Sequence, residues 1–173
     1  ATGVALIAGV LLTLLTGAEA LNRLKVNGPI YQDIIYSKDL IADILPPPLY
    51  VIESYALANE SALHTDTLNT NAARMKVLKD QYEDRRQYWK TTTLPDALKA
   101  KLLDDVLVKG DDFWREMETA TLPALLANDR AAITASLSTL RTKFHLHEAA
   151  VNELVEMGNV FGKEKEAYAA SQT

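Results

Sequence analysis

The sequence has no cysteine among its 173 residues, so disulfide bonds, thiolate metal sites and cysteine nucleophiles are excluded. Glycine and proline are scarce, with 7 and 6 residues, which leaves few positions where the chain can turn. Long helices fit that scarcity better than many short strands. A chain without thiols is also compatible with an oxidising compartment, so a periplasmic location is allowed.

An excess of positive charge is also lacking, since 18 Lys and Arg face 23 Asp and Glu for a net charge of −5. The only dense basic spot is Arg85-Arg86, which stands beside Glu83 and Asp84. Binding to phosphate backbones requires a clustered excess of Lys and Arg, so we predict no nucleic-acid partner. The length is that of one ordinary domain.

Motifs for catalysis or metal binding are absent: there is no nucleotide-binding glycine loop, zincin-type His pair or nucleophile elbow. His145 and His147 are two residues apart, so they should point to different sides of a helix and not share a metal. Asp39 and Asp43 share a helix face that would suit a cation or an amine, although a solvated face is the commoner interpretation. We predict a protein that is not an enzyme and holds no metal or cofactor.

The longest apolar run covers residues 4–18, which carry no charge. A spanning helix usually needs about 20 apolar residues. We interpret residues 1–20 as the C-terminal part of a first transmembrane helix, and residues 21–173 as a four-helix ligand-binding sensor domain. A cleaved signal peptide and a buried core helix are the alternatives.

Helical periodicity dominates the remainder. Turn-forming residues interrupt it at three places, which predicts four helices joined by three corners. The first corner is placed at the three prolines 46–48, because each ring removes a backbone donor and restricts the residue before it. The second helix is predicted from about residue 49 to 88 or 89. Its seam, the positions spaced four and three residues apart that should face the interior of the bundle, consists of Leu57, Ser61, His64, Leu68, Asn71, Met75, Leu78, Tyr82, Arg85 and Trp89.

The second corner is predicted at residues 91–96 and the third at 127–129, where Asn128 or Asp129 would cap the fourth helix. Gly110 and Pro123 are expected to weaken or bend the third helix. The clearest seam is that of the fourth helix: Ile133, Leu137, Leu140, Phe144, His147, Val151, Leu154, Gly158 and Phe161. We predict an all-α fold, an antiparallel up-down-up-down four-helix bundle with long helices.

A candidate ligand site follows from aligning the predicted helices by their distance from the first and third corners. Arginine offers a planar fork for a carboxylate and aromatic rings offer apolar walls, so such a set suits a small organic acid. The alternative is an ordinary aromatic core layer edged by exposed arginines. The predicted ligand-binding residues are Tyr36, Tyr55, Trp114, Arg115, Arg141, Phe144 and His145.

Several stretches resemble the sensor region of a family of bacterial methyl-accepting chemotaxis proteins. The first is KVNGPIY at residues 25–31, and the second is KDLIADILPPPLYVIESY at residues 38–55. The second half adds further matches, so that the resemblance covers most of the chain after Leu21: Trp89, Phe113-Trp114, Leu122-Pro123-Ala124 and residues 144–155.

The resemblance implies a periplasmic domain at the bacterial inner membrane, flanked by two transmembrane helices, in a homodimeric receptor whose cytoplasmic signalling region lies outside these residues. Related bundles recognise organic acids or amino acids, so we expect a small-molecule ligand, a carboxylate or an amino acid, and signalling by helix displacement. Two alternatives stay open. The domain would serve a histidine kinase or a cyclic-dinucleotide enzyme, or it would be a structural helical interaction module without a small ligand.

Overall fold

The computed structural model describes residues 2–24, 28–44 and 49–171, and no strand occurs in these ranges. The chain is therefore all-helical where it is described, as predicted. A 3-10 turn lies at Thr65–Thr67, and π-helical segments η2 and η3 lie at Leu102–Val106 and Met117–Thr121. The α-helices are α1 (Thr2–Leu24), α2 (Pro29–Ile44), α3 (Leu49–Leu63), α4 (Leu68–Thr91), α5 (Asp96–Lys101), α6 (Leu107–Glu116), α7 (Leu122–Ala127) and α8 (Arg130–Ser171).

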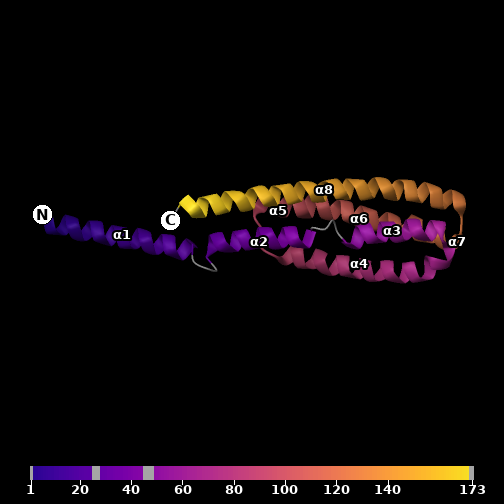
Figure 1. Ribbon diagram of the computed structural model, residues 1–173, viewed down its shortest axis with the longest axis horizontal. Coiled ribbons are helices and arrows are strands. Elements are labelled where there is room, and N and C mark those ends of the chain that lie inside the picture. Colours follow the sequence, from indigo (N-terminus) through magenta and orange to yellow (C-terminus); the bar gives the residue numbers. More distant parts are fainter. Residues whose placement is uncertain (1, 25–27, 45–48, 172–173) are drawn as a thin grey trace.

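The helices from α2 onward form a long bundle in which α2 and α3 lie end to end along α8 (Figure 1). As residue numbers rise along α2 and α3, the numbers of their partners on α8 fall. Three contacts show this: Asp33 with Lys165 at 2.7 Å, the ring of Tyr55 with that of Phe144 at 4.7 Å, and the carbonyl of Ala62 with Arg130 at 3.3 Å. The chain therefore keeps one direction from α2 through α3.

The first reversal lies after α3, at residues 64–67, where α4 turns back to pack against α3. His64 is exposed, and its carbonyl accepts hydrogen bonds from the backbone N–H of Thr67 at 3.1 Å and the Thr67 hydroxyl at 2.8 Å. The prediction of a corner at the prolines is wrong, as is that of one helix from 49 to 88 or 89. Prolines 46–48 themselves lie outside the described residues.

The other two corners lie where the sequence predicts them. Helix α4 ends at Thr91 and α5 begins at Asp96. At the third corner Asn128 has a left-handed backbone with φ of 51°, and the Asp129 carboxylate accepts hydrogen bonds from two free amides, those of Ala131 at 3.0 Å and Ala132 at 3.1 Å. Asp129 is therefore the predicted cap of α8.

The helical stretch from α5 to α7 is irregular in two places, η2 and η3. Segment η3 ends immediately before α7, whose second residue is Pro123, and a proline cannot donate the regular helical hydrogen bond. Gly110 lies inside helix α6, between the two irregular segments η2 and η3. Its role is close packing, described below.

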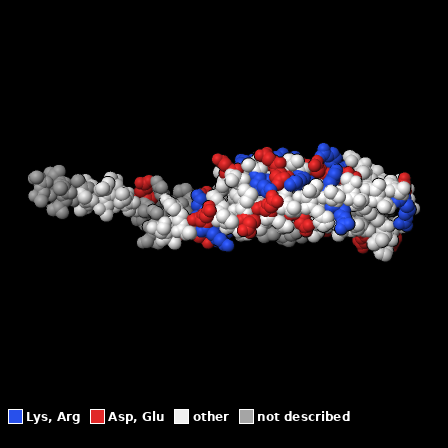
Figure 2. Space-filling model, turned by 90° about the horizontal axis from the view of Figure 1, so that it is seen from above, with Lys and Arg blue, Asp and Glu red and all other residues white. Residues whose placement is uncertain are grey.

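The core follows the predicted seams closely. On α8 the buried side chains include Leu140, Phe144, His147, Val151 and Leu154, and on α4 they include Met75, Leu78, Tyr82 and Trp89. Around this core, Figure 2 shows acidic and basic side chains interspersed over the visible face of the bundle. That face carries no large area of one sign.

Helix α1 projects away from the bundle (Figure 1). Apolar side chains along it are exposed, among them Ile7 at 64%, Leu12 at 65% and Leu15 at 68%. Within the described ranges, no helix combines the length and the apolar character that crossing a membrane requires.

Candidate functional site

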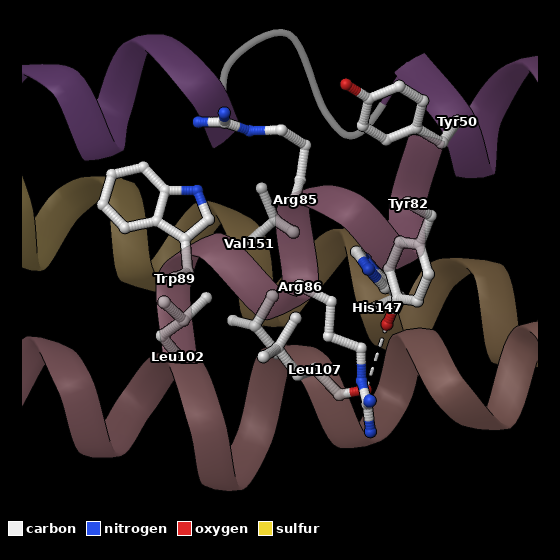
Figure 3. Close-up of a pocket in the computed structure, with 10 residues that line it drawn as sticks. Tyr50, Tyr82, Arg85, Arg86, Trp89, Leu102, Leu107, His147 and Val151 are labelled. Carbon is white, nitrogen blue, oxygen red and sulfur yellow. Dashed lines mark hydrogen bonds between the residues drawn. The ribbon is translucent and has the colours of Figure 1, made fainter. Parts of the chain in front are cut away.

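A small cavity opens between α4, the η2–α6 stretch and α8, beside the start of α3 (Figure 3). Its volume is about 50 Å³. One water needs roughly 10–15 Å³ on that scale, so the cavity has room for a group of a few heavy atoms. It is lined by Tyr50, Tyr82, Arg85, Arg86, Trp89, Leu102, Val106, Leu107, His147 and Val151.

One wall of the cavity is a hydrogen-bonded chain of polar side chains. The hydroxyl of Tyr82 donates to Asp111 at 3.0 Å and also contacts the carbonyl of Leu107 at 3.3 Å. Arg86 donates to the second oxygen of Asp111 at 2.6 Å. Burial, reinforced by the negative charge of Asp111, raises the pKa of Tyr82 well above its ordinary value, so the hydroxyl stays protonated.

His147 reaches the cavity from α8 and is only 2% exposed. Burial lowers the pKa of His147 to about 4, with a smaller contribution from nearby Lys109, so the imidazole is neutral at physiological pH. The ring approaches Gly110 of α6 so closely that a Cβ there would lie 2.9 Å from its Nε2, and closer still to the Tyr82 hydroxyl. The absence of a side chain at Gly110 lets Tyr82, from α4, and His147, from α8, meet against α6.

Arg86, one of the lining residues, carries an unsatisfied donor. The Nε–H of Arg86 is buried without a hydrogen-bond partner among the described residues. The guanidinium of Arg85 lies 4.3 Å from the ring of Tyr88 and 5.7 Å from that of Trp89. Two arginines beside aromatic and aliphatic walls favour a small ligand that carries a carboxylate.

The seven predicted ligand-binding residues are not brought together. Tyr55 and Phe144 stack with ring centroids 4.7 Å apart. Tyr36 does not join this pair. Asp33, on the same helix three residues before Tyr36, pairs with Lys165 of α8. Lys165 lies 21 positions (165 − 144) beyond Phe144, which corresponds to about 31 Å of helix, so Tyr36 lies at another level. The predicted alignment failed here because it placed a reversal at the prolines between the two tyrosines.

The remaining predicted residues point in different directions. Trp114 is buried, with its ring 5.9 Å from that of Tyr82. Arg115 is exposed and pairs with Asp112. Arg141 and His145 are exposed on α8, in a shallow hollow that side chains of α8 alone line. The two arginines chosen from the sequence therefore lie exposed on α6 and α8.

The two histidines point apart, as predicted: His145 is exposed beside Glu148, with 3.1 Å between Nδ1 and the carboxylate, and His147 is buried. Asp39 is exposed, whereas the side chain of Asp43 lies outside what the structure describes. Among the described residues, no three His, Asp or Glu side chains are grouped so that they would hold a metal ion.

In the sequence, the cavity residues carry only the signals of core positions or of charge. Tyr82, Arg85, Trp89 and His147 all occupy predicted seam positions, and Arg86 belongs to the basic pair already noted. The sequence signal that points to this cavity is the presence of polar side chains at inward positions of two helices. That pattern locates the cavity only together with the register of α4 against α8.

Comparisons of this chain with protein-family models, with curated proteins and with solved structures found no match. The resemblance to chemotaxis receptors stays a prediction.

Proposed function

We propose that this chain is the extracytoplasmic sensor domain of a homodimeric methyl-accepting chemotaxis receptor and that it binds a small carboxylate. The bundle order we propose is up-down-up-down, with α2 and α3 together as the first rod. The observation that carries the ligand proposal is the buried Nε–H of Arg86, a residue that lines the cavity; this donor has no partner among the described residues. A carboxylate oxygen would satisfy that donor.

The size of the cavity limits the class of ligand. With about 50 Å³ available, it would hold the carboxylate group and one or two carbon atoms, while a longer chain would extend through the mouth. The apolar side chains of Leu102, Val106 and Val151 would contact the carbon atoms. Formate, acetate and propionate are therefore the first probes.

The signal would travel along α8. This helix runs without interruption for 42 residues, about 63 Å, and carries His147 and Val151 to the cavity. Its C-terminal part pairs with α2 through Lys165 and Asp33 at 2.7 Å, at the end of the bundle that α1 adjoins (Figure 1). A ligand that prefers one packing of α8 against α4 and α6 would shift α8 and hence this end.

Helix α1 would provide the contact with lipid. Its exposed apolar side chains are not covered by the bundle, and a lipid phase would remove their surface from water. The proposed receptor thus places the cavity and the membrane at different levels of one rod, linked by α8.

Thermal-shift measurements with formate, acetate and propionate test the proposal, with acetamide and propionamide as uncharged controls of similar shape. We expect the acids to raise the melting temperature and the amides to leave it unchanged, since only a ligand of the folded state stabilises it. Equal effects of acids and amides, or none from any acid at millimolar concentration, would contradict carboxylate sensing. The structural-module alternative would then be favoured.

Arg85→Gln is the informative variant, because Arg86 also holds Asp111 in place. Losing a charge-assisted contact should weaken acetate binding by roughly tenfold or more. Arg141→Gln is the matched control: this arginine is exposed on α8 away from the cavity, so affinity should be unchanged.

A further inference from the structure

The mouth of the cavity is marked by the exposure of the lining residues. Seven of the ten are buried, and the three that are half-buried are Tyr50 of α3 with Arg85 and Arg86 of α4. A route from solvent into the cavity therefore passes these three side chains, because the other walls are buried. Figure 3 shows Tyr50 and Arg85 on one side of the cavity and Leu102 and Leu107 on the opposite side.

The two arginines at the mouth are held by neighbouring side chains. The guanidinium of Arg86 donates to Asp111 of α6 at 2.6 Å. The guanidinium of Arg85 lies 4.3 Å from the ring centroid of Tyr88 on the same helix. Tyr50 is therefore the side chain that can most readily change the width of the mouth.

Tyr50 is held more loosely than Tyr82, the other tyrosine of the cavity. Among the described residues no hydrogen bond joins the Tyr50 hydroxyl to a partner, whereas the Tyr82 hydroxyl donates to Asp111 at 3.0 Å. The Tyr50 ring packs against the core and stays partly exposed. Side chains that reach solvent rotate quickly, so this ring can leave the mouth without a movement of α3. The helix itself is anchored by Val51 and Ser54, which are 1% and 0% exposed.

The volume of the cavity limits what fits behind the Tyr50 ring. About 50 Å³ suffices for a carboxylate group with one or two carbon atoms. Each further methylene of a straight-chain acid has to occupy the mouth, where the phenol ring lies. Burial of a methylene favours binding only where space exists, and the ring must be displaced to create that space.

We propose that Tyr50 determines the length of the ligand: its ring closes the mouth over straight-chain acids up to propionate and disfavours longer ones. This inference rests on the carboxylate site proposed above and adds the class of acid that the site selects. Acetate and propionate bind behind the ring, whereas butyrate and pentanoate must displace it.

The fluorescence of one tryptophan reports on the cavity. The chain contains two tryptophans, and Trp89 lines the cavity whereas Trp114 does not. In the Trp114→Phe background, titrations with acetate, propionate, butyrate and pentanoate therefore give a dissociation constant for each acid. With Tyr50 in place, we expect pentanoate to bind at least roughly tenfold more weakly than propionate.

Tyr50→Ala in the same background removes the ring and should reverse this order. Pentanoate should then bind more tightly than propionate, because each methylene that becomes buried strengthens binding by up to roughly fourfold. The affinity for acetate, which does not reach the mouth, should stay unchanged. Tyr50→Phe keeps the ring and lacks only the hydroxyl, so it should keep the order of the wild type.

Tyr168→Ala is the matched control, because this tyrosine is 44% exposed near the end of α8 and does not line the cavity. It should leave the order of the acids unchanged. If Tyr50→Ala does not fold, Tyr50→Val, which keeps part of the contact with the core, takes its place.

Two kinds of failure are distinguishable. If pentanoate binds the Trp114→Phe protein as tightly as propionate, or if Tyr50→Ala does not change the order of the acids, the role assigned to Tyr50 is wrong while the carboxylate site stands. The absence of a response to any acid in all of these proteins would contradict the carboxylate site itself and, with it, this proposal.

Discussion

The hydroxyl of Tyr82 donates to the carboxylate of Asp111 at 3.0 Å and thereby joins α4 to α6 at the wall of the cavity. Arg86 holds the other oxygen of the same carboxylate at 2.6 Å. The fold and the proposed site therefore share these groups: the contacts that fasten two helices also set the position of the cavity arginine.

Tyr82→Phe should destabilise the bundle by about 1–2 kcal/mol, because Asp111 and the carbonyl of Leu107 lose a donor in a buried place. Urea unfolding measures the change. Tyr88→Phe is the matched control, since Tyr88 is 44% exposed and should be nearly neutral. Equal effects of the two variants would show that the Tyr82 hydroxyl contributes no specific stability.

Gly110→Ala should also destabilise, although alanine is usually the better helix former. The new Cβ would lie 2.9 Å from Nε2 of His147 and nearer to the Tyr82 hydroxyl, which its hydrogen bonds hold in place. Overpacking of this kind costs about 1–3 kcal/mol. Gly9→Ala in α1, where nothing lies within 4 Å of the added carbon, should not lower the melting temperature. A Gly110→Ala protein as stable as the wild type would refute the close approach of three helices.

Stability should depend on the protonation of His147. The unfolded chain takes up this proton near the ordinary pKa of 6.5, whereas burial delays uptake in the folded chain to about 4. The unfolded state thus binds more protons between these values, so the free energy of unfolding falls as the pH is lowered through this window. The full contribution, about 3 kcal/mol, is present at neutral pH.

The measurement is urea unfolding at several pH values for the wild type and for His147→Asn. Comparison of the two proteins separates this contribution from that of carboxylates such as Asp105, whose pKa is lowered by hydrogen bonds from Lys101 and Lys109. Identical pH dependence in both proteins would contradict a buried neutral imidazole.

The membrane contact proposed for α1 predicts a separable variant. Leu12→Glu places a charge on a position that is 65% exposed, so it should weaken co-sedimentation with lipid vesicles while the melting temperature of the bundle stays unchanged. Thr13→Ser is the matched control at the neighbouring position, since it keeps the hydroxyl that donates to the carbonyl of Gly9 at 2.8 Å. Undiminished sedimentation of Leu12→Glu would argue against insertion of this helix.

The helical class and most of the core were readable from the sequence because the apolar spacing along α8 and α4 is regular. Asp129 was readable as a cap because its side chain acts locally. The first corner could not be predicted from the sequence in this way. Residues 64–67 contain no glycine or proline, and the turn depends on the carbonyl of His64 and the hydroxyl of Thr67, whereas the prolines at 46–48 gave a stronger local signal.

That error explains why Tyr36 was not brought to the level of Tyr55. With a reversal at the prolines, Tyr36 and Tyr55 would have faced the same level; in the structure they are separated along one rod. Arg115, Arg141 and His145 fail for another reason, because they are exposed on the outer faces of their helices. The cavity depends on the register of three helices at Gly110, where Tyr82 and His147 approach. Such a convergence has no local pattern in the sequence.

Carboxylate binding in the cavity can be followed at the cavity itself by titrating the Trp114→Phe variant with acetate and recording the emission of Trp89, which lines it. We expect a saturable change that acetamide does not produce and that Arg85→Gln weakens by roughly tenfold or more. A flat titration, or equal responses to acetate and acetamide, would show that the cavity is not a carboxylate site.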